Sequence, residues 1–247
     1  MRSVLTAFCL MILLTGPNAA SQPLQKGVEF LENGQYEQAK GQFLRSNTLE
    51  AAEFLGDLAS FRKNWNDAVK YYKKLVEQEP SSAVYNFKLG GALGMKAMEI
   101  GKLQAVFLID DIKKYLNNAA ELDSTHAEVR RALVEFYTEL PMILGGSRDT
   151  AEGFATELET INPIDAALAW AYIFQANDEH ERAKQQYARA ISLATTNKNY
   201  ISRNYLNYEL GKASAVQEVA FESGIVFLQN YIKNYGYKDL KPPAWAY

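Results

Sequence analysis

Residues 50–80 read EAAEFLGDLASFRKNWNDAVKYYKKLVEQEP and contain the pattern that decides the fold. Gly56 follows the apolar Leu55, Ala68 lies twelve residues later, and Tyr72 lies four residues after Ala68. Two antiparallel helices approach closely only where side chains at the contact are small, and larger apolar side chains then fill the space around it. The stretch therefore predicts two packed helices joined by a short turn.

A small residue in one helix, followed by a small or aromatic residue in the next, recurs along the chain. The residues that carry this pattern are Gly27 and Ala39; Leu55, Gly56, Ala68, Tyr72 and the closing Pro80; Gly90; Ala151; Ala171, Ala183 and Tyr187; and Gly211. The spacing between equivalent small positions of successive first helices drifts, from 29 residues between Gly27 and Gly56 to 44 between Gly90 and Val134. This variable spacing predicts about six helical hairpins.

This pattern resembles the tetratricopeptide repeat (TPR), a helix-turn-helix unit of about 34 residues. The resemblance implies an all-α fold, a right-handed superhelical solenoid of about six TPR-like helical hairpins. Residues 90–174 also resemble a largely uncharacterised family of exported bacterial TPR proteins. Residues 137–147 carry its phrase Tyr-x-x-x-Pro-x-x-x-Gly-Gly-Ser, whereas Ser124 stands where that family usually has proline. This second resemblance implies fold and compartment, and no activity.

Two units depart from the regular period. In the third unit we expect a longer first helix or an inserted turn between Gly94 and Asp110, and a second helix over about 111–122. In the fourth unit a loop precedes a helix that begins near Arg148, with Ser147 as its N-cap. The free backbone N–H groups at 145–147 could instead bind an anion, and the cap is the interpretation that we prefer.

The N-terminus reads as a signal peptide. Met1-Arg2 is followed by the eleven-residue apolar run Val4–Leu14 and by the small residues 19–21. We predict that residues 1–21 are removed near Ser21, that residues 22–247 form the TPR-like helical repeat domain, and that the protein is periplasmic or secreted. No transmembrane segment is expected after cleavage. The alternatives are an uncleaved anchor and lipid attachment at Cys9, which bulky Phe8 disfavours.

The composition excludes several classes of protein. The 247 residues hold 26 Lys plus Arg against 29 Asp plus Glu, a net charge of −3, which disfavours a nucleic-acid binder. The hydrophobic content of 48% excludes general disorder. The two histidines, His126 and His180, lie in different units, and no catalytic, phosphate-binding or metal-binding motif occurs. We therefore expect no cofactor, no metal and no enzymatic activity.

In a TPR array the first helices of the hairpins line a concave groove. Projection from the small residue of each unit gives the candidates for partner binding: Glu53, Asp57, Phe61, Phe87, Met95, Arg131, Glu135, Thr138, Tyr172, Gln175, Tyr205, Tyr208 and Lys212. Tyr205 and Tyr208 lie on one face of a helix and could form an aromatic patch with Tyr172. The alternative is that these aromatic side chains pack between hairpins.

The function that we predict from the sequence is a periplasmic, non-enzymatic TPR scaffold that binds a protein or peptide partner in this groove. One alternative is a ligand-handling accessory subunit of a solute transport system, which a closed pore or an oligomer would favour. A second alternative is an enzyme, which the missing catalytic motifs disfavour. Residues 242–247 look like the start of a further first helix.

Overall fold

The computed structural model describes residues 21–239, which are helical with no strand among them. The helices are α1 Ser21–Glu32, α2 Tyr36–Phe43, α3 Leu49–Phe61, α4 Trp65–Gln78, α5 Ala83–Glu99, α6 Lys102–Val106, α7 Ile109–Leu122, α8 Ala127–Glu139, α9 Arg148–Ile161, α10 Pro163–Ala176, α11 His180–Thr196, α12 Asn204–Gln217 and α13 Phe221–Lys233. Two 3₁₀ turns, η1 Met142–Leu144 and η2 Lys198–Tyr200, lie in the loops. The chain divides into two compact units, one up to Ala51 and one from Ala52 onward.

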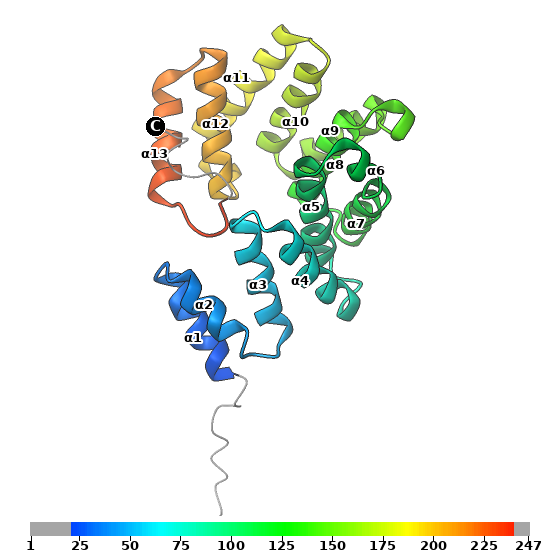
Figure 1. Cartoon of the computed structure of the whole chain (residues 1–247). Helices are drawn as coiled ribbons and strands as arrows, with labels where there is room; N and C mark the ends of the chain where they lie inside the picture. Colours follow the sequence, from blue (N-terminus) through cyan, green and yellow to red (C-terminus); the bar gives the residue numbers. More distant parts are fainter. Residues whose placement is uncertain (1–20, 240–247) are drawn as a thin grey trace, which may run out of the picture. The chain divides into compact units, whose positions relative to one another are not determined.

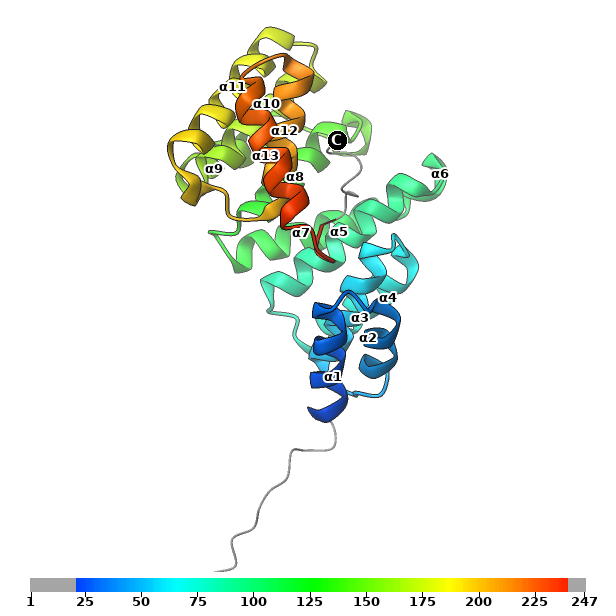
Figure 2. The same cartoon turned by 90° about the vertical axis from the view of Figure 1, so that its left-hand side faces the viewer.

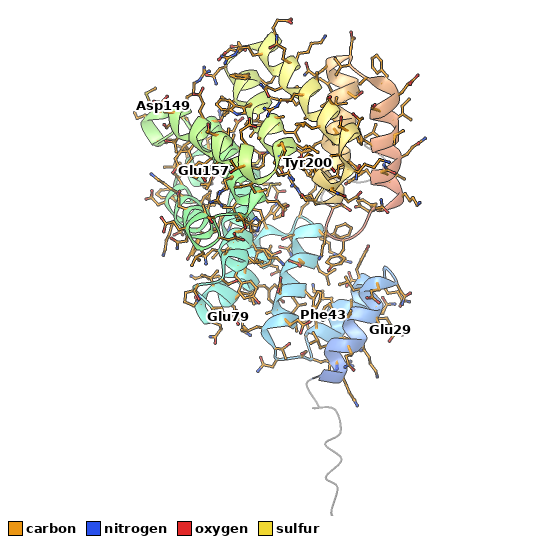
Figure 3. The ribbon with its side chains drawn as sticks, turned by 180° about the vertical axis from the view of Figure 1, so that it is seen from behind. Glu29, Phe43, Glu79, Asp149, Glu157 and Tyr200 are labelled. Atoms are coloured by element: carbon orange, nitrogen blue, oxygen red, sulfur yellow. The ribbon has the colours of Figure 1, made fainter. Side chains whose placement is uncertain are left out.

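The first unit contains the hairpin of α1 and α2. Gly27 faces the ring of Phe43, and a Cβ atom at this position would lie 2.4 Å from the ring atom Cε1. Phe43, labelled in Figure 3, and Ala39 are fully buried. The turn between the helices uses Gly34 at φ +69°, a conformation that glycine adopts without strain. The small residues thus allow the two helices of the first predicted hairpin to pack closely.

The second unit is a succession of antiparallel helix pairs (Figure 1). The pairs are α3 with α4, α5 with α7, α8 with α9, α10 with α11, and α12 with α13. Each pair also packs against the next, as α4 does on α5 and α10 on α8 and α9. The predicted all-α repeat of helical hairpins is confirmed, because each hairpin buries one face internally and another against its neighbour.

The glycines of the repeat pattern lie at helix contacts. A Cβ atom at Gly56 would lie 2.4 Å from Tyr72 Cε1, and one at Gly211 would lie 2.4 Å from Leu228 Cγ. The side chain nearest to Gly56 is therefore the Tyr72 ring of α4. Ala68, on the same helix as Tyr72, is fully buried. Gly90 makes the equivalent contact with Leu116. The remaining repeat positions Ala151, Ala171 and Ala183 have no exposed surface, and Tyr187 is half-buried.

The irregular units follow the sequence prediction. The third hairpin contains the short inserted helix α6, and its second helix α7 begins two residues earlier than expected, at Ile109. In the fourth hairpin Ser147 Oγ accepts a hydrogen bond of 3.2 Å from Thr150 N, so Ser147 is the N-cap of α9. A Cβ atom at Gly146 would collide with the Leu140 carbonyl oxygen at 1.6 Å. The tight turn before α9 thus requires glycine, which agrees with a structural role for this loop rather than an anion-binding role.

The predicted signal peptide, apart from Ser21, and residues 242–247 lie outside the described residues. Within residues 21–239 no helix is both long enough and apolar enough to cross a membrane.

Candidate functional site

The first helices of the second unit, which are α3, α5, α8, α10 and α12, carry most of the predicted groove residues. We call their partly exposed polar and aromatic side chains the first-helix face. It comprises Glu53, Asp57 and Phe61 on α3, Phe87 and Lys88 on α5, Glu135 on α8, Tyr172 on α10, and Tyr205 and Glu209 on α12. Two polar clusters and one row of aromatic rings organise this face.

The first polar cluster joins α3 to its two neighbours. Lys88 Nζ on α5 lies 2.6 Å from Glu53 Oε1 and 2.7 Å from Asp57 Oδ1. The hydroxyl of Tyr72 on α4 donates a hydrogen bond of 2.8 Å to Asp57 Oδ1. Burial and the nearby Asp57 carboxylate raise the pKa of the Tyr72 phenol, so it remains a neutral donor. The structure thus brings the predicted groove residues Glu53 and Asp57 together as one acidic pair with a single lysine.

The second polar cluster joins α8, α10 and α12. Asp165 on α10 has no exposed surface, and its Oδ1 lies 3.3 Å from Arg131 Nη1 on α8 and 2.7 Å from Arg203 Nη2, at the start of α12. Arg131 Nη2 also lies 2.7 Å from Glu209 Oε1 on α12. A buried charge is tolerated only when it is paired and hydrogen-bonded, and Asp165 meets that condition because both of its carboxylate oxygens accept from arginine. The cluster therefore fixes three successive first helices relative to one another.

The ionisation of Asp165 follows from these contacts. Burial alone would raise its pKa, but the hydrogen bonds and positive charges of Arg203 and Arg131 outweigh burial and hold the pKa below its usual range. Glu135, whose carboxylate lies 3.6 Å from Arg131 and whose side chain is 48% exposed, behaves differently. Partial loss of water raises its pKa, although Arg131 opposes the change. Asp165 thus serves structure, whereas the Glu135 side chain keeps surface that a partner can reach.

The expectation that Arg131 faces a partner is wrong. Its side chain is only 8% exposed, because the guanidinium is taken up by Asp165 and Glu209 between helices. Sequence reasoning also missed Asp165, Arg203 and Glu209. The signal for Asp165 was available, since an acidic residue within the apolar stretch 164–174 of a helix must find a buried partner. The identity of those partners required the three-dimensional stacking.

A row of aromatic rings joins the last hairpin to α3. The ring centroids of Tyr205 and Tyr208 lie 5.7 Å apart, Tyr208 and Tyr231 5.3 Å, Tyr231 and Tyr235 5.9 Å, and Tyr235 and Phe61 6.3 Å. These separations are those of interacting aromatic pairs. The row connects three predicted groove residues through Tyr231, which the sequence predicts to pack inward, and through Tyr235, which it does not single out.

The expected open position of Tyr208 is also wrong. Tyr208 is 6% exposed, because its ring lies between those of Tyr205 and Tyr231, so its contribution is to packing. Tyr205 remains half-buried. Tyr172, which we expected beside them, directs its hydroxyl to Glu139, with 2.5 Å between the two oxygens. Only Tyr172 and Tyr205 of the predicted patch therefore keep surface for a partner.

The other candidates are distributed along the same helices. Phe87 is half-buried and packs against the ring of His126 at 5.1 Å, whereas Met95 and Thr138 are half-buried on α5 and α8. Gln175 is exposed and lies within hydrogen-bonding distance of His180, and Lys212 is exposed on α12.

Neither a metal site nor an enclosed pocket stands out on this face. Within residues 21–239 no group of three or more His, Cys, Asp or Glu side chains is placed to hold a metal ion. One shallow hollow is lined by residues 178–182, from the end of the turn between α10 and α11 and the first residues of α11. That hollow contains none of the predicted groove residues.

The chain is similar to solved TPR structures. TTC0263, a thermophilic TPR protein of Thermus thermophilus, has 21% identity and a TM-score of 0.58, over 79% of this chain and 98% of TTC0263. Human IFIT1, solved as a dimer with PPP-AAAA, has 12% identity and a TM-score of 0.60, over 87% of this chain and 55% of IFIT1. No protein-family model and no curated protein matches the chain. At these identities the similarity shows the fold, a TPR-type helical repeat.

Proposed function

We propose that this protein is a non-enzymatic TPR scaffold that binds a protein or peptide partner on its first-helix face. The observation that supports this most strongly is the arrangement around Arg131. Buried ion pairs hold α8, α10 and α12 in place, while Glu135, Tyr172 and Tyr205 keep accessible surface on those three helices. A rigid surface that presents tyrosines and a carboxylate suits polypeptide recognition, because little ordering is needed on binding.

The charge of this face favours a polypeptide over a nucleic acid. The acidic residues of α3, α5, α8, α10 and α12 are Glu50, Glu53, Asp57, Glu99, Glu128, Glu135, Glu139, Asp165 and Glu209, whereas the basic residues of these helices and of the Arg203 cap are Lys88, Lys96, Arg130, Arg131, Arg203 and Lys212. An RNA ligand needs positive charge to neutralise its phosphates. The TPR fold that this chain shares with IFIT1 therefore does not carry over the PPP-AAAA ligand of that protein, and a neutral or basic segment is the better fit.

We also propose that the chain is exported, so that the partner is periplasmic or extracellular. The basis is the N-terminal sequence, with Arg2 before the apolar run 4–14 and small residues at 19–21. N-terminal sequencing of the protein from the periplasmic fraction tests this. A new N-terminus near Gln22 supports export, and a chain that starts at Met1 in the cytosol contradicts it.

Affinity capture tests the scaffold function. Purified chain from Gln22 onward is used as bait in a periplasmic extract. Two variants are tested beside it: the first-helix variant Glu135→Ala/Tyr172→Ala, and a matched control on the second helix α11, Glu181→Ala/Gln185→Ala, which we call the outer-face variant. We expect proteins that the wild type and the outer-face variant retain and that the first-helix variant loses. Equal retention by all three baits would contradict binding at this face.

A further inference from the structure

The segment that follows α13 returns to α3. It comprises residues 234–239, and in Figures 1 and 2 it is the red segment that continues from α13. Asp239 is 6% exposed, and its Oδ2 accepts hydrogen bonds of 3.1 Å from Asn204 Nδ2 and 3.0 Å from Gly236 N. These contacts fix a turn at the N-terminal end of α12. Tyr235, which precedes this turn, lies against α3.

Tyr235 contacts a predicted groove residue there, and Tyr237 is influenced by the charge of two others. The centroid of the Tyr235 ring lies 6.3 Å from that of Phe61, the last residue of α3. Tyr237 is half-buried, and burial together with the negative charges of Asp57 and Glu53 raises the pKa of its phenol. The segment therefore places one aromatic ring on Phe61 and a second phenol in the field of the acidic pair.

These contacts are of the kind that a bound peptide makes. The residues from Tyr235 to Asp239 lie outside any helix, carry tyrosines at the alternate positions 235 and 237, and place the first of them against Phe61 of α3. Tyrosine suits such contacts, because it offers a large rigid ring and a hydroxyl with few rotatable bonds. The segment also follows the last described helix of the array, where local opening costs the least free energy.

The carboxylates of α3 favour an uncharged hydrogen-bond donor in a bound segment. Glu53 and Asp57 share one lysine, Lys88, and Tyr72 already donates to Asp57, so part of the negative charge is neutralised. Carboxylate oxygens accept further hydrogen bonds, which a phenol can supply without adding a buried charge. Phe61 beside them provides the apolar half of the contact. A tyrosine-containing segment matches both halves.

We propose that Glu53, Asp57 and Phe61 form a binding site for a short non-helical segment with two tyrosines at alternate positions. Residues 235–239 of the same chain now fill this site, and a partner segment of the same chemistry displaces them. The proposal rests on the proposed scaffold function, and it names the partner chemistry at α3. Self-occupancy lowers the apparent affinity for an external segment in proportion to the fraction of molecules with an open site.

A peptide-binding experiment on the full chain tests this. The probe is a fluorescein-labelled peptide with the sequence of residues 234–239, and the readout is fluorescence anisotropy. We expect the variant Tyr235→Ala/Tyr237→Ala to bind the probe at least about tenfold more tightly than the wild type, because its own segment no longer competes. Adding Phe61→Ala to this variant should abolish the gain. The matched control is Tyr71→Ala/Tyr115→Ala, which should bind as the wild type does.

The outcomes are distinct. Equal affinity of the wild type and Tyr235→Ala/Tyr237→Ala for the probe would overturn the proposal, as would a gain in affinity that survives Phe61→Ala. If circular dichroism shows that the double variant is unfolded, trypsin cleavage after Lys238 decides in its place. Protection in the wild type that Phe61→Ala removes supports the site, and cleavage of the wild type at the rate of the free peptide overturns it. The peptide experiment needs no natural partner. Its result can therefore be interpreted even if affinity capture finds no partner.

Discussion

Arg131 on α8 and the fully buried Asp165 on α10 are paired at 3.3 Å, across 34 residues of sequence. Arg203 pairs with the same carboxylate at 2.7 Å, so one aspartate holds two arginines from two other hairpins. Removing the carboxylate leaves both guanidinium groups without their buried counter-charge. The stacking of three hairpins depends on this one side chain.

Asp165→Asn should therefore lower the free energy of unfolding by about 3–5 kcal/mol, the usual cost of breaking a buried ion pair. Urea denaturation followed by circular dichroism measures it. The control is Glu152→Gln, which removes an i,i+4 surface pair with Arg148 and should cost less than about 1 kcal/mol. Similar small losses for both variants would show that the buried cluster does not stabilise the stack.

The pH dependence gives the same variant a second signature. The pKa of Asp165 lies below its usual range when the protein is folded, so the unfolded chain binds the proton more readily. This contribution is present above the ordinary aspartate pKa of about 3.9 and is lost as the pH falls through the folded value. The free energy of unfolding should thus fall less steeply below about pH 4 in Asp165→Asn than in the wild type. Parallel pH profiles would contradict the assignment.

Gly56→Ala tests the packing of the hairpin from which the fold was predicted. The added Cβ atom would lie 2.4 Å from the Tyr72 ring, so we expect a loss of about 1–3 kcal/mol from overpacking. Gly153→Ala is the matched control, because Gly153 lies in α9 with nothing within 4 Å of its Cβ position. That change should stabilise by up to about 1 kcal/mol through helix propensity. Equal effects on the thermal midpoint would mean that the hairpin register is wrong.

The parts of the fold that depend on local spacing could be predicted from the sequence. Gly56 and Tyr72 are 16 residues apart, and Ser147 caps a helix that begins at the next residue, so periodicity and capping rules find them. The site depends on contacts between distant hairpins. Tyr235 meets Phe61 across 174 residues, and the helix register that directed Tyr208 to a partner carried no information on Tyr231. Sequence periodicity shows which residues share one face of a helix. Only the stacking of the hairpins shows which other residues cover that face.

Tyr208→Ala separates packing from recognition in the aromatic row. Tyr208 is buried between Tyr205 and Tyr231, so its truncation should cost about 3 kcal/mol, as for other large core side chains. Tyr172→Phe, by contrast, removes only a hydroxyl that bonds to Glu139 and should change stability by less than about 0.5 kcal/mol. Thermal melts of the two variants decide. An unchanged midpoint for Tyr208→Ala would restore the view that it faces a partner.

Ser147→Ala tests the structural interpretation of the loop before α9. The hydroxyl oxygen accepts a hydrogen bond from Thr150 N, and the loss of such a cap costs about 0.5–2 kcal/mol. Ser147→Asp should retain most of the stability, because aspartate is an equally good N-cap. Binding to a captured partner should persist while the variant is folded. Unchanged stability with abolished binding would make the loop a recognition site.

We expect partners to bind the first-helix face. Photo-crosslinking tests it most directly, with benzoylphenylalanine placed in turn at exposed Gln175 on α10, at exposed Lys212 on α12 and, as a control, at exposed Gln185 on the second helix α11. After irradiation of intact cells, we expect a crosslinked partner from Gln175 or Lys212 and none from Gln185. A partner that crosslinks from Gln185 but from neither first-helix position would contradict the claim.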